Sequence, residues 1–169
     1  GDYSLKLNGN SYANGAITIS GNNGVLIDWD TASTGPFTVI VKYENLNLNS
    51  SSEQVLATVK DGNYADHVGV HLQARNANYV KGIWQNNTWR NTNTKVAEEP
   101  MPSASGIFTL GYKRDGGTQL FYQSAEGDEA EKVYEYTGLN SSGSTYSGVA
   151  IGGKRGGGWA ASDMKITAI

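Results

Sequence analysis

The feature that most constrains this chain is the repetition of short segments with the alternation typical of β-strands. Residues 16–20, 37–43 and 67–73 alternate apolar and polar side chains or are rich in β-branched and aromatic ones. Clusters of Gly, Asn, Asp and Ser separate about a dozen such segments along the whole chain. Only residues 124–132 have helix-forming composition, and they lack an apolar stripe. The pattern predicts an all-β fold, an antiparallel two-sheet β-sandwich of the jelly-roll type.

The chain is predicted to form one domain over residues 1–169, because no linker divides it. Residues 98–106 carry two prolines, and we interpret them as a connection between the sheets. Two short sequences, Asp61-Gly62-Asn63 and Asp115-Gly116-Gly117, predict tight hairpins, because Gly and Asn adopt positive φ at little cost.

Strand alternation also predicts which side chains form the core. In residues 37–43, 107–113 and 119–123, large apolar side chains occupy one face and mostly polar ones the other. The predicted core side chains in these strands are Phe37, Val39, Val41, Tyr43, Phe108, Leu110, Tyr112, Leu120 and Tyr122.

Charge and composition exclude several functions. The net charge is −3, which gives no support for capture of nucleic acid or of an anionic membrane. No apolar run approaches the roughly 18 residues that span a bilayer. The absence of cysteine excludes disulfides and thiolate sites. With 22 glycines and only 17% charged residues, the composition is typical of an extracellular β-protein, secreted or on the cell surface.

Several stretches together resemble the laminin-G-like, or concanavalin A-like, lectin superfamily of jelly rolls. They are residues 106–123 (GIFTLGYKRDGGTQLFYQ), 137–139 (TGL), 148–153 (GVAIGG), Gly158-Trp159 and 163–166 (DMKI), preceded by residues 3–9 and 36–43. The resemblance covers most of the chain as a pattern and implies the β-sandwich. It also implies that a single structural calcium is possible, and it is compatible with lectins and with glycosidases.

Residues 126–131 are the strongest candidate for catalysis. Glu126, Asp128 and Glu131 resemble the Glu-x-Asp-x-x-Glu run of concanavalin-like glucanases, in which apolar residues between the carboxylates anchor the strand. Here the intervening residues include Gly127 and Ala130, which anchor nothing, so a solvated acidic loop is the better interpretation. The sequence also has no Gly-x-Ser-x-Gly motif. We therefore predict a protein that is not an enzyme, with a small glycosidase as the least favoured alternative.

Metal binding is indicated only weakly. His67 and His71 are four residues apart along a strand, about 13 Å, which is too far to chelate one ion. Asp61 and Asp66 flank a loop of residues that carry oxygen ligands, which suits calcium, although a plain turn is the better interpretation.

The sequence KGIWQNNTWRN, residues 81–91, contains two of the four tryptophans. A two-residue turn at Asn86-Asn87 would place Trp84 directly opposite Trp89. We expect Trp84 to fill the end of the sandwich, and Trp89, with Asn87 and Arg90, to be exposed for binding.

Two further segments supply candidate binding residues. His71 belongs to the less apolar face of its strand. Residues 152–159 (GGKRGGGW) lack the order of a phosphate-binding loop and are predicted to be a flexible loop. Arg155 and Trp159 in this loop either line a binding edge or, for Trp159, pack into the core.

Exposed Trp beside Asn, Arg and His suits a sugar, whose apolar ring face stacks on indole while its hydroxyl groups bind amides. We therefore predict a non-catalytic, lectin-like carbohydrate-binding module of a larger extracellular bacterial protein, appended for example to a glycoside hydrolase or a sialidase. Its partner would be a glycan or polysaccharide. A structural or adhesive domain that contacts other proteins is the main alternative.

Overall fold

The computed structural model describes residues 3–33, 35–50, 52–61, 64–74, 80–86, 93–97, 103–113, 117–123, 125–136, 146–154 and 156–169. For some strand residues, including all of those described between 58 and 97, it describes the backbone alone. None of the described residues forms a helix that is long and apolar enough to cross a bilayer.

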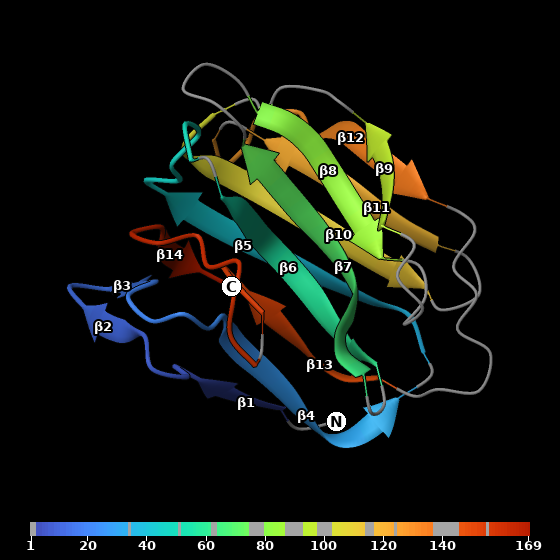
Figure 1. The fold of residues 1–169 in the computed structure, drawn as a ribbon, viewed down its shortest axis with the longest axis horizontal. Coiled ribbons are helices and arrows are strands. Elements are labelled where there is room, and N and C mark those ends of the chain that lie inside the picture. The colour runs from blue at the N-terminus through green and yellow to red at the C-terminus, as the bar shows by residue number, and fades with distance from the viewer. Residues whose placement is uncertain are drawn as a thin grey trace.

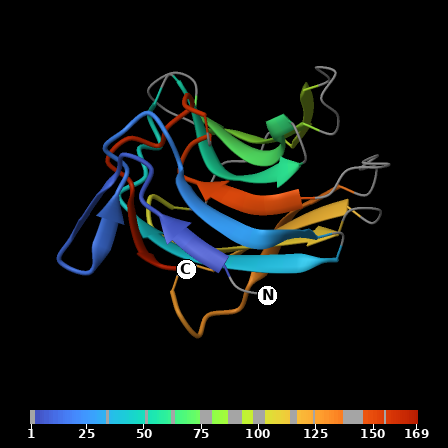
Figure 2. The ribbon, with the colours of Figure 1, turned by 90° about the horizontal axis from the view of Figure 1, so that it is seen from below.

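Two seven-stranded sheets stack face to face (Figures 1 and 2). The first sheet has the order β1 (Tyr3–Lys6), β4 (Val25–Ser33), β13 (Tyr146–Ile151), β6 (Glu53–Asp61), β7 (Tyr64–Ala74), β8 (Val80–Asn86) and β9 (Asn93–Ala97). The second has the order β12 (Glu131–Tyr136), β11 (Gly117–Gln123), β10 (Gly106–Lys113), β5 (Phe37–Glu44), β14 (Lys165–Ala168), β3 (Ala16–Thr18) and β2 (Ser11–Ala13). All neighbouring strands are antiparallel. The predicted all-β, two-sheet sandwich is therefore confirmed.

Both predicted hairpins are present. Asp61 at the end of β6 pairs with Tyr64 at the start of β7, which leaves a two-residue connection. Lys113 in β10 pairs with Gly117 in β11 in the same way, with three residues between them. Strand alternation and turn chemistry were sufficient to predict these two connections.

The core lies between the sheets, where the predicted alternation holds. In β5, Val39, Val41 and Tyr43 are buried, whereas the residues between them are exposed. Phe108 of β10 pairs with Val41, is fully buried, and has its ring centre 6.0 Å from that of Tyr43. Leu110 is buried too, and Phe37 packs against the edge of the cluster. The side chains of Tyr112, Leu120 and Tyr122 lie outside the described set.

The predicted pairing of the two tryptophans is wrong. Trp84 of β8 pairs with Lys95 of β9, and Asn86 pairs with Asn93. The register partner of Trp84 is therefore Lys95. The Asn-rich sequence favours a tight turn locally, but the register of the described residues of β8 and β9 does not follow from it.

Side chains of the N-terminal segment hold the loop between β3 and β4 in place. Asn10 is only 7% exposed. Its amide nitrogen donates to the carbonyl groups of Leu7 and Asn23, and its amide oxygen accepts from the backbone N–H groups of Ser20 and Gly21. Since one buried side chain makes all these contacts, it fixes the start of residues 20–24.

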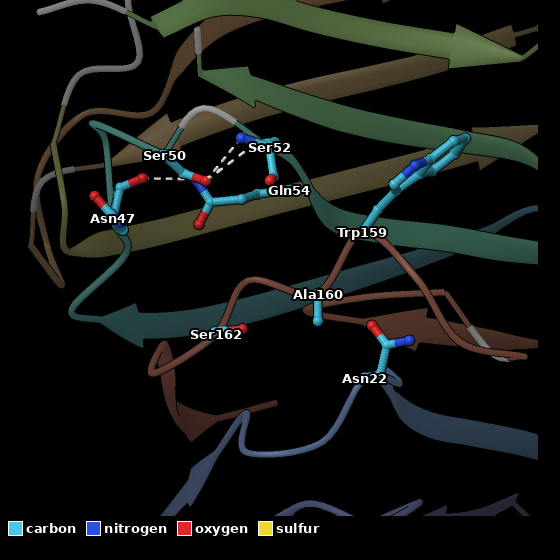
Figure 3. Close-up of a pocket in the computed structure, with 8 residues that line it drawn as sticks. All are labelled: Asn22, Asn47, Ser50, Ser52, Gln54, Trp159, Ala160 and Ser162. Carbon is cyan, nitrogen blue, oxygen red and sulfur yellow. Dashed lines mark hydrogen bonds between the residues drawn. The ribbon is translucent and has the colours of Figure 1, made fainter. Parts of the chain in front are cut away.

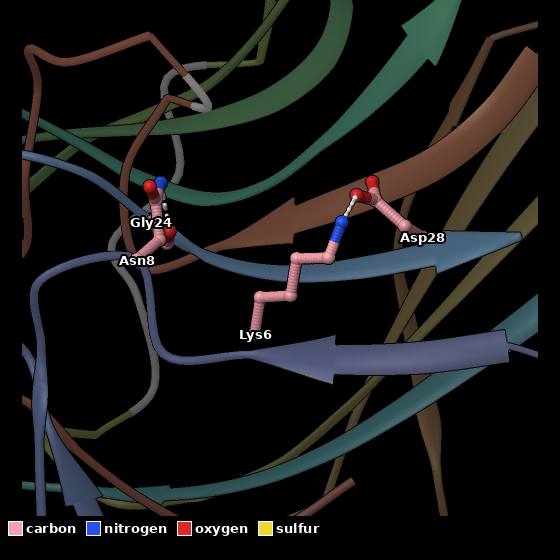
Figure 4. Close-up of polar contacts among 4 residues, drawn as sticks. All are labelled: Lys6, Asn8, Gly24 and Asp28. Atoms are coloured by element: carbon pink, nitrogen blue, oxygen red, sulfur yellow. Dashed lines mark hydrogen bonds and ion pairs between the residues drawn. The ribbon is translucent and has the colours of Figure 1, made fainter.

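Two more contacts connect β1 and the residues after it to β4 and to the loop that precedes β4 (Figure 4). The Lys6 ammonium lies 2.9 Å from Oδ2 of Asp28, and Asn8 Nδ2 donates to the carbonyl oxygen of Gly24 over 3.0 Å. The N-terminal segment thus contacts residues 20–24 on one side. A different loop contacts them on the other side.

Candidate functional site

That other loop is the glycine-rich loop, residues 152–159, which follows β13. Its Lys154 carbonyl accepts from Gly24 N over 2.8 Å, and Gly158 N donates to the Asn22 carbonyl over 2.7 Å. Within the loop, Lys154 N donates to the Gly158 carbonyl over 3.1 Å. The prediction of a flexible loop is therefore wrong, because its described residues are bonded to each other and to residues 22–24.

Glycine is required here because backbones meet without space for side chains. A Cβ on Gly24 would lie 2.3 Å from the carbonyl oxygen of Gly153, well inside contact distance. Gly152 has φ +75°, and a Cβ there would press within 2.8 Å of the Ile19 side chain. The sequence Gly-Gly at 152–153 therefore encodes close packing of two loops.

Trp159 ends the glycine-rich loop in a left-handed conformation, with φ +53°. Its carbonyl oxygen accepts from Val55 N of β6 over 3.0 Å, which attaches it to the first sheet. The ring is half-buried and lies outside the core cluster, and the Lys154 ammonium is 4.2 Å from its centre. The alternative that Trp159 packs into the core is therefore wrong.

Trp159 lines a pocket of about 360 Å³ between the loops that follow β3, β5 and β13 (Figure 3). We call it the Gln54 pocket. Its lining residues are mainly amides and hydroxyls: Asn22, Asn47, Ser50, Ser52, Gln54, Trp159, Ala160 and Ser162. Hydrogen-bonding groups of both polarities beside one aromatic ring suit a ligand rich in hydroxyl groups.

Gln54 is the buried polar residue of this pocket, only 2% exposed. Its Nε2 donates to the Asn47 carbonyl over 2.6 Å, which holds the loop of residues 47–52 against the start of β6. Ser50 and Ser52 bond to each other in the same loop, where Ser50 Oγ donates to the Ser52 carbonyl and accepts from Ser52 N. The pocket wall is therefore built by local bonds of a Ser-rich and Asn-rich connection.

A second pocket, of about 510 Å³, adjoins the first. We call it the Leu48 pocket. It shares Asn47 and Ser162 with the Gln54 pocket, and we call the two pockets together the groove. Its other lining residues are Asn45, Leu46, Leu48, Asn49, Ala104 and Asp163. Asn45 Nδ2 donates to the Asp163 carbonyl over 3.0 Å, which ties the two sides of the groove together.

The backbone register connects three of the predicted binding residues. Val55 bonds to the Trp159 carbonyl on one side and pairs with His71 of β7 on the other. His71 in turn pairs with Trp84 of β8. Trp159, His71 and Trp84 therefore occupy one row across the first sheet, although they are far apart in the sequence.

Four predicted binding residues, Asn87, Trp89, Arg90 and Arg155, lie outside the described residues. Asn87, Trp89 and Arg90 follow the end of β8, and Arg155 follows Lys154 in the glycine-rich loop. Their roles stay predictions.

The calcium candidates lie on strands. Asp61 is the last residue of β6, and Asp66 belongs to β7 across the hairpin. Their side chains are outside the description, so this site stays a prediction. Among the described residues, no group of three His, Cys, Asp or Glu side chains could hold a metal ion.

The acidic loop, residues 125–131, is exposed at every position. A turn bond from Asp128 N to the Ala125 carbonyl, 3.2 Å, and a bond from Gln123 Nε2 to the Asp128 carbonyl shape it. The ion pair between Glu126 and Lys42 spans 4.0 Å at the surface. The interpretation of a solvated loop is confirmed for residues 125–130, and Glu131 is the exposed first residue of β12, paired with Tyr122 of β11.

Comparisons with known proteins bear on the fold. No protein-family model matches the sequence, and no curated protein matches it. The metal-free crystal structure of the VIP36 exoplasmic/lumenal domain superposes with a TM-score of 0.50 at 11% identity, covering 98% of this chain and 81% of that one. The Ca²⁺- and Man3GlcNAc-bound form of the same domain gives 0.49 at 11% identity, over 98% and 80%.

The chain has the concanavalin A-like fold. The predicted resemblance is thereby confirmed at the level of architecture. The residues of the groove were mostly missed, because Asn22, Asn47 and Ser162 come from three separate connections and Gln54 from β6. The polar sequence NLNSSS, residues 47–52, was the one feature that could have indicated the groove. By itself it predicts only an ordinary loop.

Proposed function

We propose that this protein is a non-catalytic carbohydrate-binding domain and that the groove next to Trp159 is its glycan site. The observation that carries the proposal is the half-buried Trp159 at a pocket walled by amides and hydroxyls. Indole offers an apolar surface to the C–H face of a pyranose, while Asn, Gln and Ser side chains exchange hydrogen bonds with its hydroxyl groups. The likeness to VIP36 supports the architecture, and the site itself supports the function.

We extend the proposed site along the row across the first sheet. Trp84 and His71 would add contacts beyond Trp159, because the register aligns them with it. Asn87, Trp89, Arg90 and Arg155 would contribute from the connections next to this row. A site of this size suits a polysaccharide or the arm of a branched glycan.

The setting that we propose is an extracellular bacterial protein, secreted or at the cell surface. In it, residues 1–169 form one module beside others such as a glycoside hydrolase or a sialidase. The low charged fraction and the abundance of Gly support this setting. A structural calcium at Asp61 and Asp66 would be compatible with it, since both carry carboxylates on one hairpin.

A glycan array of the purified domain tests the function. We expect binding to a related set of glycans, and Trp159→Ala should reduce it about tenfold or more, since stacking and burial of one indole face are lost. Tyr12→Ala is the matched control, because Tyr12 is 64% exposed on the remote edge strand β2. A blank array from folded protein, or equal binding by Trp159→Ala, would overturn the proposal.

One observation favours an adhesive domain as the second candidate. Tyr3, Leu5 and Leu7 alternate along the edge strand β1 and beyond it, with exposures of 69%, 50% and 38%. An exposed apolar row on a sheet edge is suited to contact with another protein. If the array is blank, a Leu5→Lys variant that loses self-association or protein binding would support this function in its place.

A further inference from the structure

The Gln54 pocket has a donor set that does not fit calcium. Calcium in proteins takes six to eight oxygen ligands, usually with carboxylates among them. The residues described in the lining of this pocket carry amides, hydroxyls, an indole and a methyl group, and no carboxylate. The Lys154 ammonium beside Trp159 adds positive charge nearby, which opposes a divalent cation.

The amide of Gln54 points to what the pocket binds. Its Nε2 donates to Asn47, but its Oε1 accepts from no donor within the described part of the chain, although the side chain is 2% exposed. A buried amide oxygen without a donor costs on the order of 1–3 kcal/mol. A hydroxyl group of a ligand in the pocket would satisfy it, and a neutral ligand would do so without burying an unpaired charge.

The groove continues beyond this one amide. Asn47 and Ser162 are exposed and belong to both pockets, so a ligand unit in the Gln54 pocket can be joined to a unit in the Leu48 pocket past them. The second pocket is lined by the half-buried Leu48 and Ala104 and by the amides of Asn45 and Asn49. Apolar and polar groups in one lining suit a sugar ring with its apolar and hydroxylated faces.

We propose that the groove binds a neutral oligosaccharide without calcium, with one sugar unit in each pocket and a hydroxyl group of the first unit bonded to Oε1 of Gln54. This inference rests on the proposed glycan-binding function and makes it specific in ligand class, ligand length and metal requirement. Any calcium near Asp61 and Asp66 would then affect stability and leave the sugar contacts unchanged.

The metal requirement is tested by titrating the domain with neutral gluco-, manno- and galacto-oligosaccharides of one to four units, once with CaCl2 and once with EDTA. We expect affinities that agree within about twofold between the two conditions, and stronger binding of disaccharides than of monosaccharides. A loss of binding in EDTA overturns this inference and leaves the glycan-binding function standing. Absence of binding to every neutral oligosaccharide overturns this inference, and a glycan array that is blank for neutral and acidic glycans alike overturns the glycan-binding function as well.

Three variants test the groove. Gln54→Leu should lower affinity for all neutral ligands about tenfold, because the buried acceptor is lost. Ser162→Ala keeps the inference testable if Gln54→Leu fails to fold, since Ser162 is exposed and lines both pockets. Asn49→Ala should weaken binding of tri- and tetrasaccharides several-fold and leave monosaccharides unchanged, because Asn49 lines only the second pocket.

Thr38→Ala, an exposed β5 hydroxyl remote from the groove, is the matched control for Ser162→Ala. Affinities that stay at the wild-type value in all three groove variants would overturn the inference. If Asn49→Ala lowers affinity equally for every ligand length, the proposal of a second sugar unit in the Leu48 pocket is wrong.

Discussion

The acidic loop and the glycine-rich loop differ in how far they contact distant parts of the chain. The acidic loop carries Glu126, Asp128 and Glu131 at a spacing close to that of a catalytic strand, yet it is exposed throughout and held mainly by local bonds. The glycine-rich loop reads as flexible, yet its backbone bonds to Asn22, Gly24 and Val55, and it places Trp159 at a pocket. Contacts with distant segments, more than local residue type, decide which loop can form a site.

The difference has a simple physical origin. The carboxylates of the acidic loop keep their hydration because every residue from 125 to 131 is exposed. The glycine-rich loop has few side chains to obstruct it, so its backbone approaches residues 22–24 closely enough for hydrogen bonds. The glycines thus allow the two backbones to come close enough for hydrogen bonds to hold the glycine-rich loop.

Two glycine substitutions, one where residues 20–24 contact the glycine-rich loop and one in the acidic loop, give the largest expected difference. Gly24→Ala should destabilise the fold by about 3 kcal/mol, because its Cβ would collide with the backbone of Gly153. Gly127→Ala in the acidic loop has φ +90° but nothing within 4 Å of its Cβ, so about 1 kcal/mol is expected. Urea unfolding followed by circular dichroism measures both. Equal losses would mean that the two loops are held equally.

The buried Asn10 should give the next largest effect. Asn10→Ala removes the side-chain bonds that fix residues 20–24, which support the glycine-rich loop, and should cost about 2 kcal/mol. Glu129→Ala in the acidic loop is the control and should change stability by less than about 0.5 kcal/mol. Guanidinium unfolding of both variants tests this. A loss below that of the control would show that residues 20–24 keep their position without Asn10.

Smaller losses of stability are expected when the ion pairs Lys6–Asp28 and Lys42–Glu126 are broken. Lys6→Met breaks a 2.9 Å pair in which the Asp28 side chain is only 13% exposed, and should cost up to about 1 kcal/mol. Lys42→Met breaks the 4.0 Å pair with Glu126, whose side chain is 87% exposed, and should have no measurable effect. Thermal unfolding at low and high salt distinguishes them. A larger loss for Lys42→Met would contradict the description of the acidic loop.

The smallest effect is expected from the carboxylates themselves. Glu126→Gln and Glu131→Gln should leave glycan binding unchanged within about twofold. Binding isotherms of both variants check this. Hydrolysis of an oligosaccharide by the wild type that disappears in Glu131→Gln would instead establish the glycosidase alternative.

The fold was predictable because it depends on repeated local signals. Alternation in β5 and β10 identified Val41 and Phe108 as core, and turn chemistry placed two hairpins. The pairing of β8 and β9 was not predictable, since the sequence Asn86-Asn87 favours a turn that the register does not use.

The groove was less predictable still. Its contacts join segments far apart in the chain, as in the bond from Asn45 to Asp163, and no local pattern records them. Side-chain chemistry left Trp159 either at a binding edge or in the core, and the structure was needed to place it at a pocket. Gln54 could not be predicted, because its role depends on being buried beneath residues 47–52.

The most direct test of the account is a ¹H–¹⁵N chemical-shift titration with the strongest oligosaccharide from the array. We expect the largest shifts to cluster at Asn22, Gln54 and Ser162, with the side-chain N–H of Trp159 among them, while residues 125–131 stay unperturbed. Largest shifts in the acidic loop, with an unperturbed groove, would contradict it.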